Sequence, residues 1–258
     1  MNNVWAVSNV VIKELYRRKD FYVLFILTGL LTGLLWSLNF FNDDRIVRYL
    51  KELCLLMIWI SALVIAVVTA ARQIPAEREQ RTIFPLLAKP ITRGEFIVGK
   101  FFGCWLATGM ALVVFYLFFW IVTATRESNV PIGSYLQAIW LHWWMLGVVV
   151  ALTLLGSVIF VAPSSTITII LLAVGGILIV GRHLHHAALQ LPEPSQTILS
   201  VIYFLIPHLE FFDTRDLVVH DWGTISWVVC GLATLYAVAY TTLFLLAAWM
   251  IFRRKALN

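Results

Sequence analysis

Residues 128–181 read SNVPIGSYLQAIWLHWWMLGVVVALTLLGSVIFVAPSSTITIILLAVGGILIVG and contain no Asp, Glu, Lys or Arg. A helix of about 20 apolar residues is enough to cross the hydrocarbon core of a bilayer. The 54 uncharged residues are therefore too many for one crossing. Pro163 breaks a helix and the hydroxyl residues after it can cap the next one, so we expect a turn at residues 162–166. This stretch predicts two membrane-spanning helices.

Four more uncharged stretches flank this one, at residues 21–42, 53–71, 101–125 and 222–252. Each is long enough to cross a bilayer once as a helix. With the two helices above, they predict an all-α polytopic membrane protein with six transmembrane helices. The spans are expected near residues 21–41, 53–73, 97–123, 137–161, 165–182 and 224–252.

The composition of the whole chain supports this class. Of the 258 residues, 61% are hydrophobic and 13% are charged, whereas soluble domains average about half apolar and a quarter charged residues. A soluble fold of this size could not hide so much apolar surface from water. The same figures exclude a disordered chain or a disulfide scaffold. Cys54, Cys104 and Cys230 all lie in apolar runs and imply no disulfide.

The distribution of basic residues predicts the orientation. Six spans put both termini on one side of the membrane, and that side carries 13 of the 19 Lys and Arg residues but only 5 of the 14 acidic residues. The positive-inside rule places this side in the cytoplasm. The net charge of +5 is therefore explained by membrane topology. We expect membrane lipid as a partner and no nucleic acid.

Two segments are apolar without being obvious spans. Residues 1–20 place Val7, Val11 and Leu15 at helical spacing, which predicts an N-terminal amphipathic interface helix, or alternatively only a positively charged flank. Residues 195–209 are uncharged but too few to cross comfortably. We therefore expect an outer re-entrant helical hairpin near residues 195–215, before the last span. A short, strongly tilted span is the alternative.

The loop between the second and third spans, near residues 75–95, combines paired charges with an apolar patch at residues 83–87. Pro75 and the acidic residues after it favour a helix that begins at Pro75. Thr92 can cap the helix of the third span. A solvated loop has no need of an apolar patch, so we expect this loop to pack against a partner protein.

Residues 94–101, GEFIVGKF, come close to the phosphate-binding pattern Gly-x4-Gly-Lys-Ser/Thr. Position 101 is Phe, so no hydroxyl is available for magnesium, and no strand precedes the segment. We interpret the match as chance. This chain is therefore not expected to hydrolyse ATP.

The loop and its surroundings resemble the permease subunits of the second, export-type class of ABC transporters. The segment Lys13-Glu14-Leu15 and the outer residues 206–213 are also similar to that family, so the resemblance covers nearly the whole chain. One departure is Pro85, which interrupts the loop helix of the family. The loop motifs that carry the resemblance are Glu77 and Glu79, Thr82, Leu86-Leu87, Pro90-Ile91-Thr92-Arg93 and Gly99-Lys100.

The resemblance implies a division of labour in the inner membrane of a prokaryote. Residues 21–258 would be a permease domain that dimerises with an identical or different permease subunit. A separate ABC ATPase subunit would hold ATP and magnesium, so this chain would be no enzyme, would need no cofactor and would couple to that ATPase to export an unidentified substrate. Loop 75–95 would dock on the ATPase, unless its charges only set topology. The expected contact residues are Glu77, Glu79, Arg81, Thr82, Phe84, Leu87 and Arg93.

A cluster of histidines supports a second hypothesis. His183, His185 and His186 lie at the expected outer end of the fifth span. Imidazole binds copper, zinc and heme iron, so the chain could be a membrane enzyme or a metal- or heme-handling maturation factor. Interfacial histidines without a ligand are the alternative, because no Cys or Met is interleaved. A third hypothesis is a membrane anchor or assembly factor with no transport role.

Overall fold

In the computed structural model, every described element is a helix. The structure describes residues 2–17, 22, 26, 29–30, 33, 44–79, 92–124, 132–189, 192–193 and 195–254. The all-α fold class predicted above is confirmed for these residues. In chain order the elements are α1 (Asn2–Arg17), α3 (Asp44–Glu79), α5 (Arg93–Ala124), α6 (Ile132–Ile159), α7 (Pro163–Leu189), α8 (Ser195–Leu205), the 3-10 helix η1 (Leu209–Phe212), α9 (Arg215–Val219) and α10 (Trp227–Arg254).

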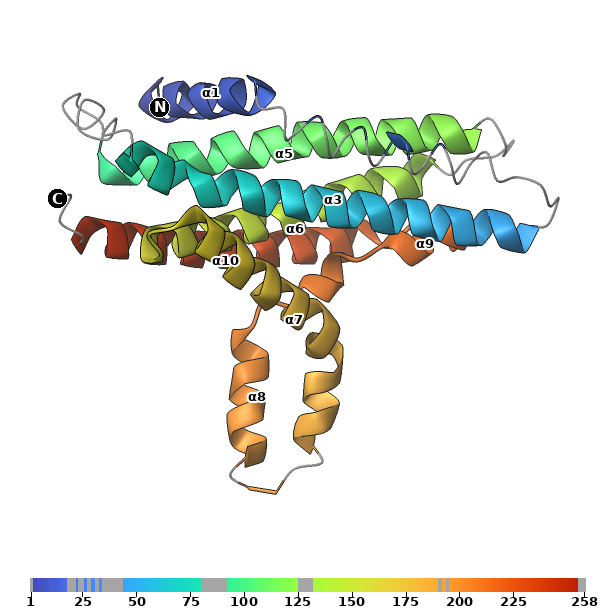
Figure 1. Cartoon of the computed structure of the whole chain (residues 1–258). Helices are drawn as coiled ribbons and strands as arrows, with labels where there is room; N and C mark the ends of the chain where they lie inside the picture. The colour runs from blue at the N-terminus through green and yellow to red at the C-terminus, as the bar shows by residue number, and fades with distance from the viewer. Residues whose placement is uncertain are drawn as a thin grey trace.

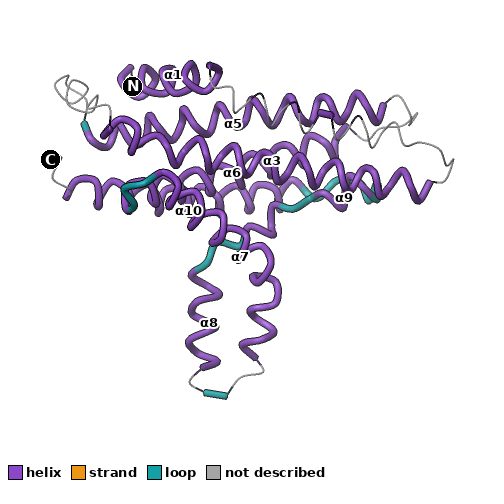
Figure 2. Tube along the Cα trace, viewed as in Figure 1, coloured by secondary structure: helices purple, strands orange, loops and turns teal. Residues whose placement is uncertain are grey.

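Four long helices, α3, α5, α6 and α10, lie side by side and form the body of the molecule (Figures 1 and 2). Helix α6 is the central one, since it packs against α3, α5, α7 and α10. Its side chains Met145, Leu146 and Leu154 are fully buried. Among the described residues, α6 is the most buried of the four and α10 the least.

These four helices are also long and apolar enough to cross a membrane. They overlap the spans predicted near residues 53–73, 97–123, 137–161 and 224–252. A shorter apolar helix, Pro163–Ile179, overlaps the span predicted at 165–182. Most of the first predicted span, 21–41, lies outside the described residues. The structure thus supports a multi-pass helical membrane protein, and the total of six spans stays a prediction.

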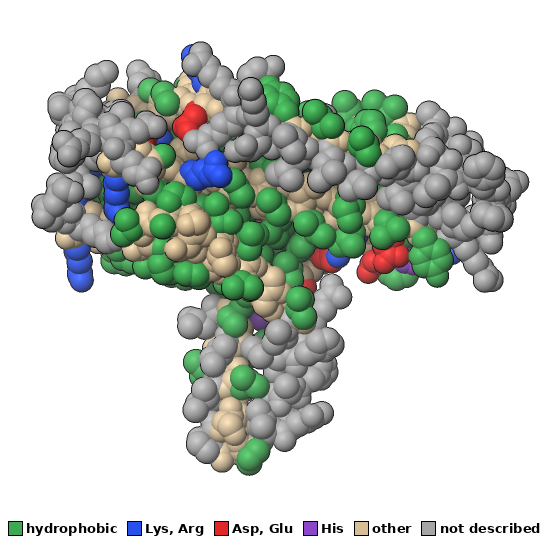
Figure 3. Space-filling view, viewed as in Figure 1, with side chains coloured by type: hydrophobic (Ala, Val, Ile, Leu, Met, Phe, Trp, Pro, Cys, Tyr) green, Lys and Arg blue, Asp and Glu red, His purple; other side chains and the backbone are tan. Residues whose placement is uncertain are grey.

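Surface chemistry agrees with a membrane-embedded bundle. On the face shown in Figure 3, hydrophobic side chains cover the middle of the bundle. Most of the basic side chains in this view lie in the half that holds α1 and the end of α10, with acidic atoms among them, and most of the acidic side chains lie near α9, toward the other end. A belt of apolar side chains between charged ends is what a bilayer requires.

Two tryptophans fasten α5 to α6 in a reciprocal arrangement. Trp105 Nε1 donates to the carbonyl oxygen of Trp143 at 2.9 Å, and Trp143 Nε1 donates to that of Trp105 at 3.2 Å. The two rings stack with centroids 4.5 Å apart. Each ring also lies against a glycine of the opposite helix, Gly109 for Trp143 and Gly147 for Trp105. The contact therefore depends on two Trp-x3-Gly patterns on facing helices.

Helix α1 runs alongside the first half of α5 and in the same direction (Figure 1). Gly99 and Gly103 make this possible, because a Cβ at either position would lie within 3 Å of Val7 or Val11. Ser8 Oγ donates to the carbonyl oxygen of Gly99 at 2.9 Å. Residues 2–17 are thus helical, as the amphipathic pattern predicts. That α1 lies in the headgroup layer stays a prediction.

The chain breaks between α6 and α7 as predicted, but the break lies at residues 160–162, and most of the turn predicted at 162–166 is the first turn of α7; Pro75 causes no break. Helix α6 ends at Ile159 and α7 begins at Pro163. In contrast, α3 continues without a break through Pro75 to Glu79, although the sequence favoured a new helix beginning at Pro75. Proline costs α3 one backbone hydrogen bond, while burial of Ile74 against α5 and α10 favours keeping the helix intact.

The segment predicted as an outer re-entrant hairpin, 195–215, is divided between two places. Helix α8 lies beside the second half of α7, and together they project sideways from the bundle (Figure 1). The 3-10 helix η1 and α9 instead return to the bundle, where they pack against α3 and α6. A re-entrant hairpin is therefore not established by this arrangement.

Candidate functional site: the loop end of the bundle

We use the name loop end for the end of the bundle where α3 ends, α5 begins and α10 ends (Figure 1). The chain between Glu79 and Thr92 leaves and re-enters the bundle here. Residues 80–91 of that connection lie outside the described part of the structure. The site is therefore described from the helix ends that hold the connection.

A small apolar cluster joins the helix ends at this site. It is formed by buried side chains of four helices, and two of them, Phe96 and Phe252, stack with ring centroids 5.8 Å apart. Because close-packed interiors resist deformation, these helix ends form one firm base at the loop end. The cluster members are Ile74, Phe96, Ile97, Val158, Ala248 and Phe252.

A charge pair between the buried Lys100 and the partly buried Glu77 links α3 to α5 beside this cluster. Lys100 Nζ forms an ion pair with Glu77 and also donates to Gln73 Oε1 at 3.1 Å. Lys100 is only 2% exposed. Its ammonium group also lies 5.6 Å from the centre of the Phe96 ring. A buried charge is costly unless it is paired and hydrogen-bonded, and this lysine meets both conditions.

Arg93 links the start of α5 to the end of α10. Its Nη1 donates to the carbonyl oxygens of Phe252 at 2.9 Å and Arg253 at 3.0 Å. The guanidinium also lies 5.7 Å from the centre of the Phe252 ring. The last carbonyl groups of a helix lack partners within the helix and carry partial negative charge, so a cation there satisfies them.

The start of α5 is capped as the sequence predicts. The backbone N–H of Glu95 donates to Thr92 Oγ1 at 3.2 Å, and the backbone N–H of Thr92 donates to Glu95 Oε2 at 2.8 Å. This reciprocal pair is a capping box, which fixes the entry of the chain into a helix. The predicted cap at Thr92 is confirmed. Residues 94–101 form the first turns of α5 and no phosphate-binding loop.

The predicted docking residues are only partly covered by the described structure. Glu77 and Arg93 point into the chain itself, as described above. Glu79 is the last residue of α3. Arg81, Thr82, Phe84 and Leu87 lie outside the described residues. Their contact with an ATPase stays a prediction.

Sequence reasoning missed Gln73 as a participant. The available signal was its spacing, because Gln73 and Glu77 are four residues apart and face the same side of one helix. Lys100 was noted in the Gly99-Lys100 motif, but nothing local in the sequence connects it to α3.

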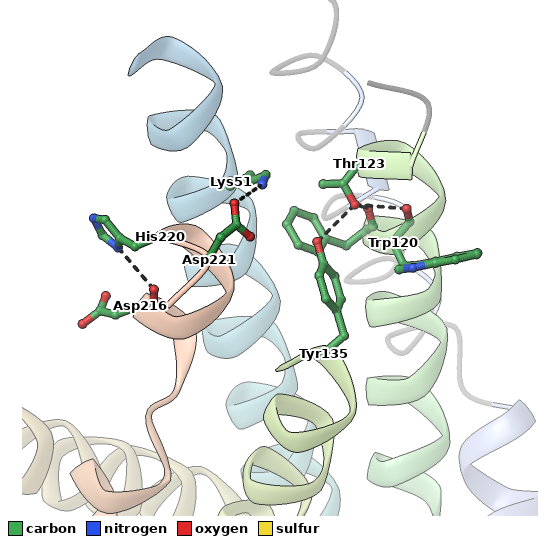
Figure 4. A network of polar contacts seen from close by, with 8 residues as sticks. Lys51, Trp120, Thr123, Tyr135, Asp216, His220 and Asp221 are labelled. Atoms are coloured by element: carbon green, nitrogen blue, oxygen red, sulfur yellow. Dashed lines mark hydrogen bonds and ion pairs between the residues drawn. The ribbon is translucent and has the colours of Figure 1, made fainter. Parts of the chain in front are cut away.

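The opposite end of the bundle holds several polar contacts (Figure 4). The ammonium group of Lys51 lies 4.0 Å from an Asp221 carboxylate oxygen. Asp221 has a positive φ of 52°, a conformation that Asp tolerates better than most residues. Gln137 exchanges two hydrogen bonds with the backbone of Ile225, at 2.8 and 2.9 Å. These contacts fasten the segment before α10 to α3 and α6.

A stack of side chains lies deeper at the same end. The guanidinium of Arg215 is 5.3 Å from the centre of the Trp59 ring, which stacks on His142. Arg215 also makes two 2.8 Å hydrogen bonds to the carboxylate of Asp213. These bonds raise the pKa of the Arg215 guanidinium, so this side chain carries its positive charge at neutral pH. The stack anchors α9 against the spans.

The histidine hypothesis gains no support here. Among the described side chains, no group of three or more His, Cys, Asp or Glu residues comes together as a metal site. His183, His185 and His186 belong to the last turns of α7, but their side chains lie outside the described part. Whether they bind metal stays a prediction.

The family of this chain is shown by comparison of its sequence with models of known protein families. A search of curated proteins finds no match to this chain. The family described as "ABC-2 family transporter protein" matches residues 10–257, which is nearly the full length. Members of this family are the membrane subunits of transporters and are not themselves catalytic. The apolar helices fit such a subunit, so the chain belongs to the ABC-2 transporter family and is a membrane permease of an ABC transporter.

Proposed function

We propose that this chain is one of two permease subunits, identical or different, that together form an export pathway. A separate ATPase subunit that binds ATP and magnesium would supply the energy. The exported substrate is unidentified. The family match over residues 10–257 supports this arrangement, and the lack of a phosphate-binding loop at residues 94–101 agrees with hydrolysis in another chain.

The observation that carries the proposal is the firm base at the loop end. A conformational change driven by ATP in another chain must enter through a rigid contact. Both helices that flank residues 80–91 are fixed there, α5 by its capping box and by Arg93, and α3 by the apolar cluster. A force on the connection would therefore reach α3, α5 and α10 together.

The proposed topology follows from charge and span length. The loop end would face the cytoplasm with both termini, in the inner membrane of a prokaryote. Six spans would cross the membrane, with the first near residues 21–41. The segment 195–215 would lie on the outer side.

The proposed docking surface is the connection between α3 and α5. Glu79, Arg81 and Thr82 would make polar contacts with the ATPase. Phe84 and Leu87 would be its apolar anchors. Arg81 and Phe84 are the expected main contributors, because arginine and aromatic side chains are enriched at protein interfaces.

The test is recovery of an ATPase with the tagged chain in mild detergent. The wild-type chain is compared with an Arg81→Ala/Phe84→Ala double variant, and bound proteins are identified by mass spectrometry and assayed for ATP hydrolysis. We expect a protein with Walker motifs to co-purify with the wild type. The double variant should recover about tenfold less, because it lacks one polar and one apolar anchor.

Asp216→Ala is the matched control, since Asp216 is exposed at the opposite end of the bundle. It should recover as much ATPase as the wild type. If a folded wild-type chain brings down no nucleotide-binding protein, the proposed function is wrong. If both variants lose the ATPase equally, the docking surface is not the one proposed.

A further inference from the structure

Lys100 is the most deeply buried basic side chain among the described residues of the loop end. Its ammonium group contacts Glu77 and Gln73 of α3 and the ring of Phe96 of its own helix. Gln73 is itself 4% exposed, and its amide donates to the carbonyl oxygen of Thr69 at 3.4 Å. Lys100 therefore contacts polar side chains from two successive turns of α3.

The stability of the fold does not by itself require the ion pair between Lys100 and Glu77. Replacing a buried ion pair with apolar side chains of similar size is often neutral or stabilising. The surroundings are apolar and close-packed, so such a replacement would fit. A buried pair does, however, fix one relative position of two helices, because sliding either helix would separate opposite charges in a region that excludes water.

The contacts of Lys100 continue to the third helix of the loop end. Phe96, which lies under the ammonium group, stacks on Phe252 of α10. The backbone carbonyl of Phe252 accepts a hydrogen bond from Arg93, at the start of α5. The path thus leads from α3 through Lys100 to α10 and back to the first residue of α5. It joins both sides of the connection that we propose to dock on the ATPase.

Two different faces of α5, about 100° apart around the helix, are used at this point. Gly99, the preceding residue, faces α1 and contacts Val7, while Lys100 faces α3. Two neighbouring residues therefore hold α5 between α1 and α3, and α5 has little freedom to rotate.

From these contacts we propose that Lys100 is a positioning residue for energy coupling. Through Glu77 and Gln73 it makes the end of α3 and the start of α5 move as one body when the ATPase displaces the connection. Glu77 then acts inside the permease and not as a contact to the ATPase. This inference rests on the proposed function, and it names the residues that carry the movement away from the docking surface.

The experiment uses the complete complex of this chain with its co-purified ATPase. Hydrogen–deuterium exchange is measured for residues 65–79 and 93–105, with and without ATP plus vanadate. In the wild type, trapping the nucleotide should change exchange in both segments. In a neutral Glu77→Gln/Lys100→Met variant, the change in residues 65–79 should fall about fivefold or more, as expected when two sites lose their coupling. The amount of bound ATPase should stay close to that of the wild type.

Two further variants separate positioning from mere stability. Lys51→Met removes another buried, paired lysine of α3, at the opposite end of the bundle. It should keep the nucleotide-dependent change in both segments even if it lowers the melting temperature. The exchanged pair Glu77→Lys/Lys100→Glu restores opposite charges and should recover the change in residues 65–79. This variant serves as the test if the neutral variant does not fold.

The results that overturn the inference are distinct. Unchanged nucleotide-dependent exchange in the neutral variant shows that α3 receives the movement without the pair. Loss of the ATPase from both the neutral and the exchanged variant shows that these residues serve docking and not positioning. If the wild type itself binds no ATPase, the proposed function fails, which is a different result from either of these.

Discussion

At the scale of single residues, glycine and tryptophan decide how α5 and α6 meet. The rings of Trp105 and Trp143 occupy the space that side chains at Gly147 and Gly109 would need. A Cβ on Gly109 would lie 2.4 Å from Trp143 Nε1. That nitrogen is already held by its hydrogen bond to the backbone of Trp105, so the ring cannot simply move aside.

A Gly109→Ala substitution should therefore destabilise the protein by roughly 1–3 kcal/mol, the usual cost of overpacking a close contact. Thermal unfolding in detergent measures the effect. Gly231→Ala is the matched control, because no atom lies within 4 Å of a Cβ at Gly231 of α10. Alanine favours a helix, so the control should be neutral or slightly stabilising. Equal melting temperatures for the two variants would contradict the close contact described here.

The residue scale also shows what a sequence can and cannot predict. The cap at Thr92 is a local pattern within four residues, so it can be read directly. The pair of Lys100 with Glu77 joins positions 23 residues apart across an intervening connection. No local sequence pattern around Glu77 or Lys100 specifies that these two residues pair. The two Trp-x3-Gly patterns are visible in the sequence, but only the packing of α5 on α6 gives them a meaning.

At the scale of elements, uncharged runs predict the long helices well. Apolar length is required by the bilayer itself, so a run such as residues 101–125 can hardly be anything but a span. Pro163 is equally informative, since it starts a helix in the structure. Pro75 is not informative in this way, because the packing of Ile74 against neighbouring helices keeps α3 helical beyond the proline. The arrangement of α7 and α8 depends on distant contacts, and no local pattern predicts it.

The start of α5 gives a prediction at this scale. Thr92→Ala removes the side-chain oxygen that accepts from the backbone of Glu95. Amide exchange in the first turn of α5 should become about fivefold faster, as loss of a helix cap predicts. Thr242→Ala is the control, because Thr242 lies in α10 and its hydroxyl donates to the carbonyl oxygen of Val238 in the same helix. Exchange in residues 93–100 that does not change in Thr92→Ala would show that Arg93 alone holds this end.

At the scale of the whole molecule, the start of α1, the end of α10 and the two helix ends that flank residues 80–91 lie at one end of the bundle (Figure 1). This agrees with an even number of crossings. The segment from η1 to the start of α10 lies toward the opposite end, where Lys51, Gln137 and Arg215 hold it. The two ends of the bundle therefore differ. The loop end holds the helix ends that flank the proposed docking connection, and at the opposite end the segment from η1 to the start of α10 packs against the long helices.

Site-directed labelling tests the proposed orientation. His220→Cys and Arg254→Cys place thiols at exposed positions near opposite ends of the bundle. A membrane-impermeant maleimide should label the first in intact cells and the second only after permeabilisation. The unsubstituted chain is the control, since Cys54, Cys104 and Cys230 are all buried. The reverse labelling pattern would place the termini outside.

The reciprocal contact between Trp105 and Trp143 also has a consequence for biogenesis. It needs only α5, α6 and the short connection between them, and every partner it uses lies within residues 105–147. Helices inserted one after another can associate within the bilayer once both are present. This helical hairpin can therefore form during synthesis, before α10 has left the ribosome, and it offers α10 and α3 a finished surface on which to assemble.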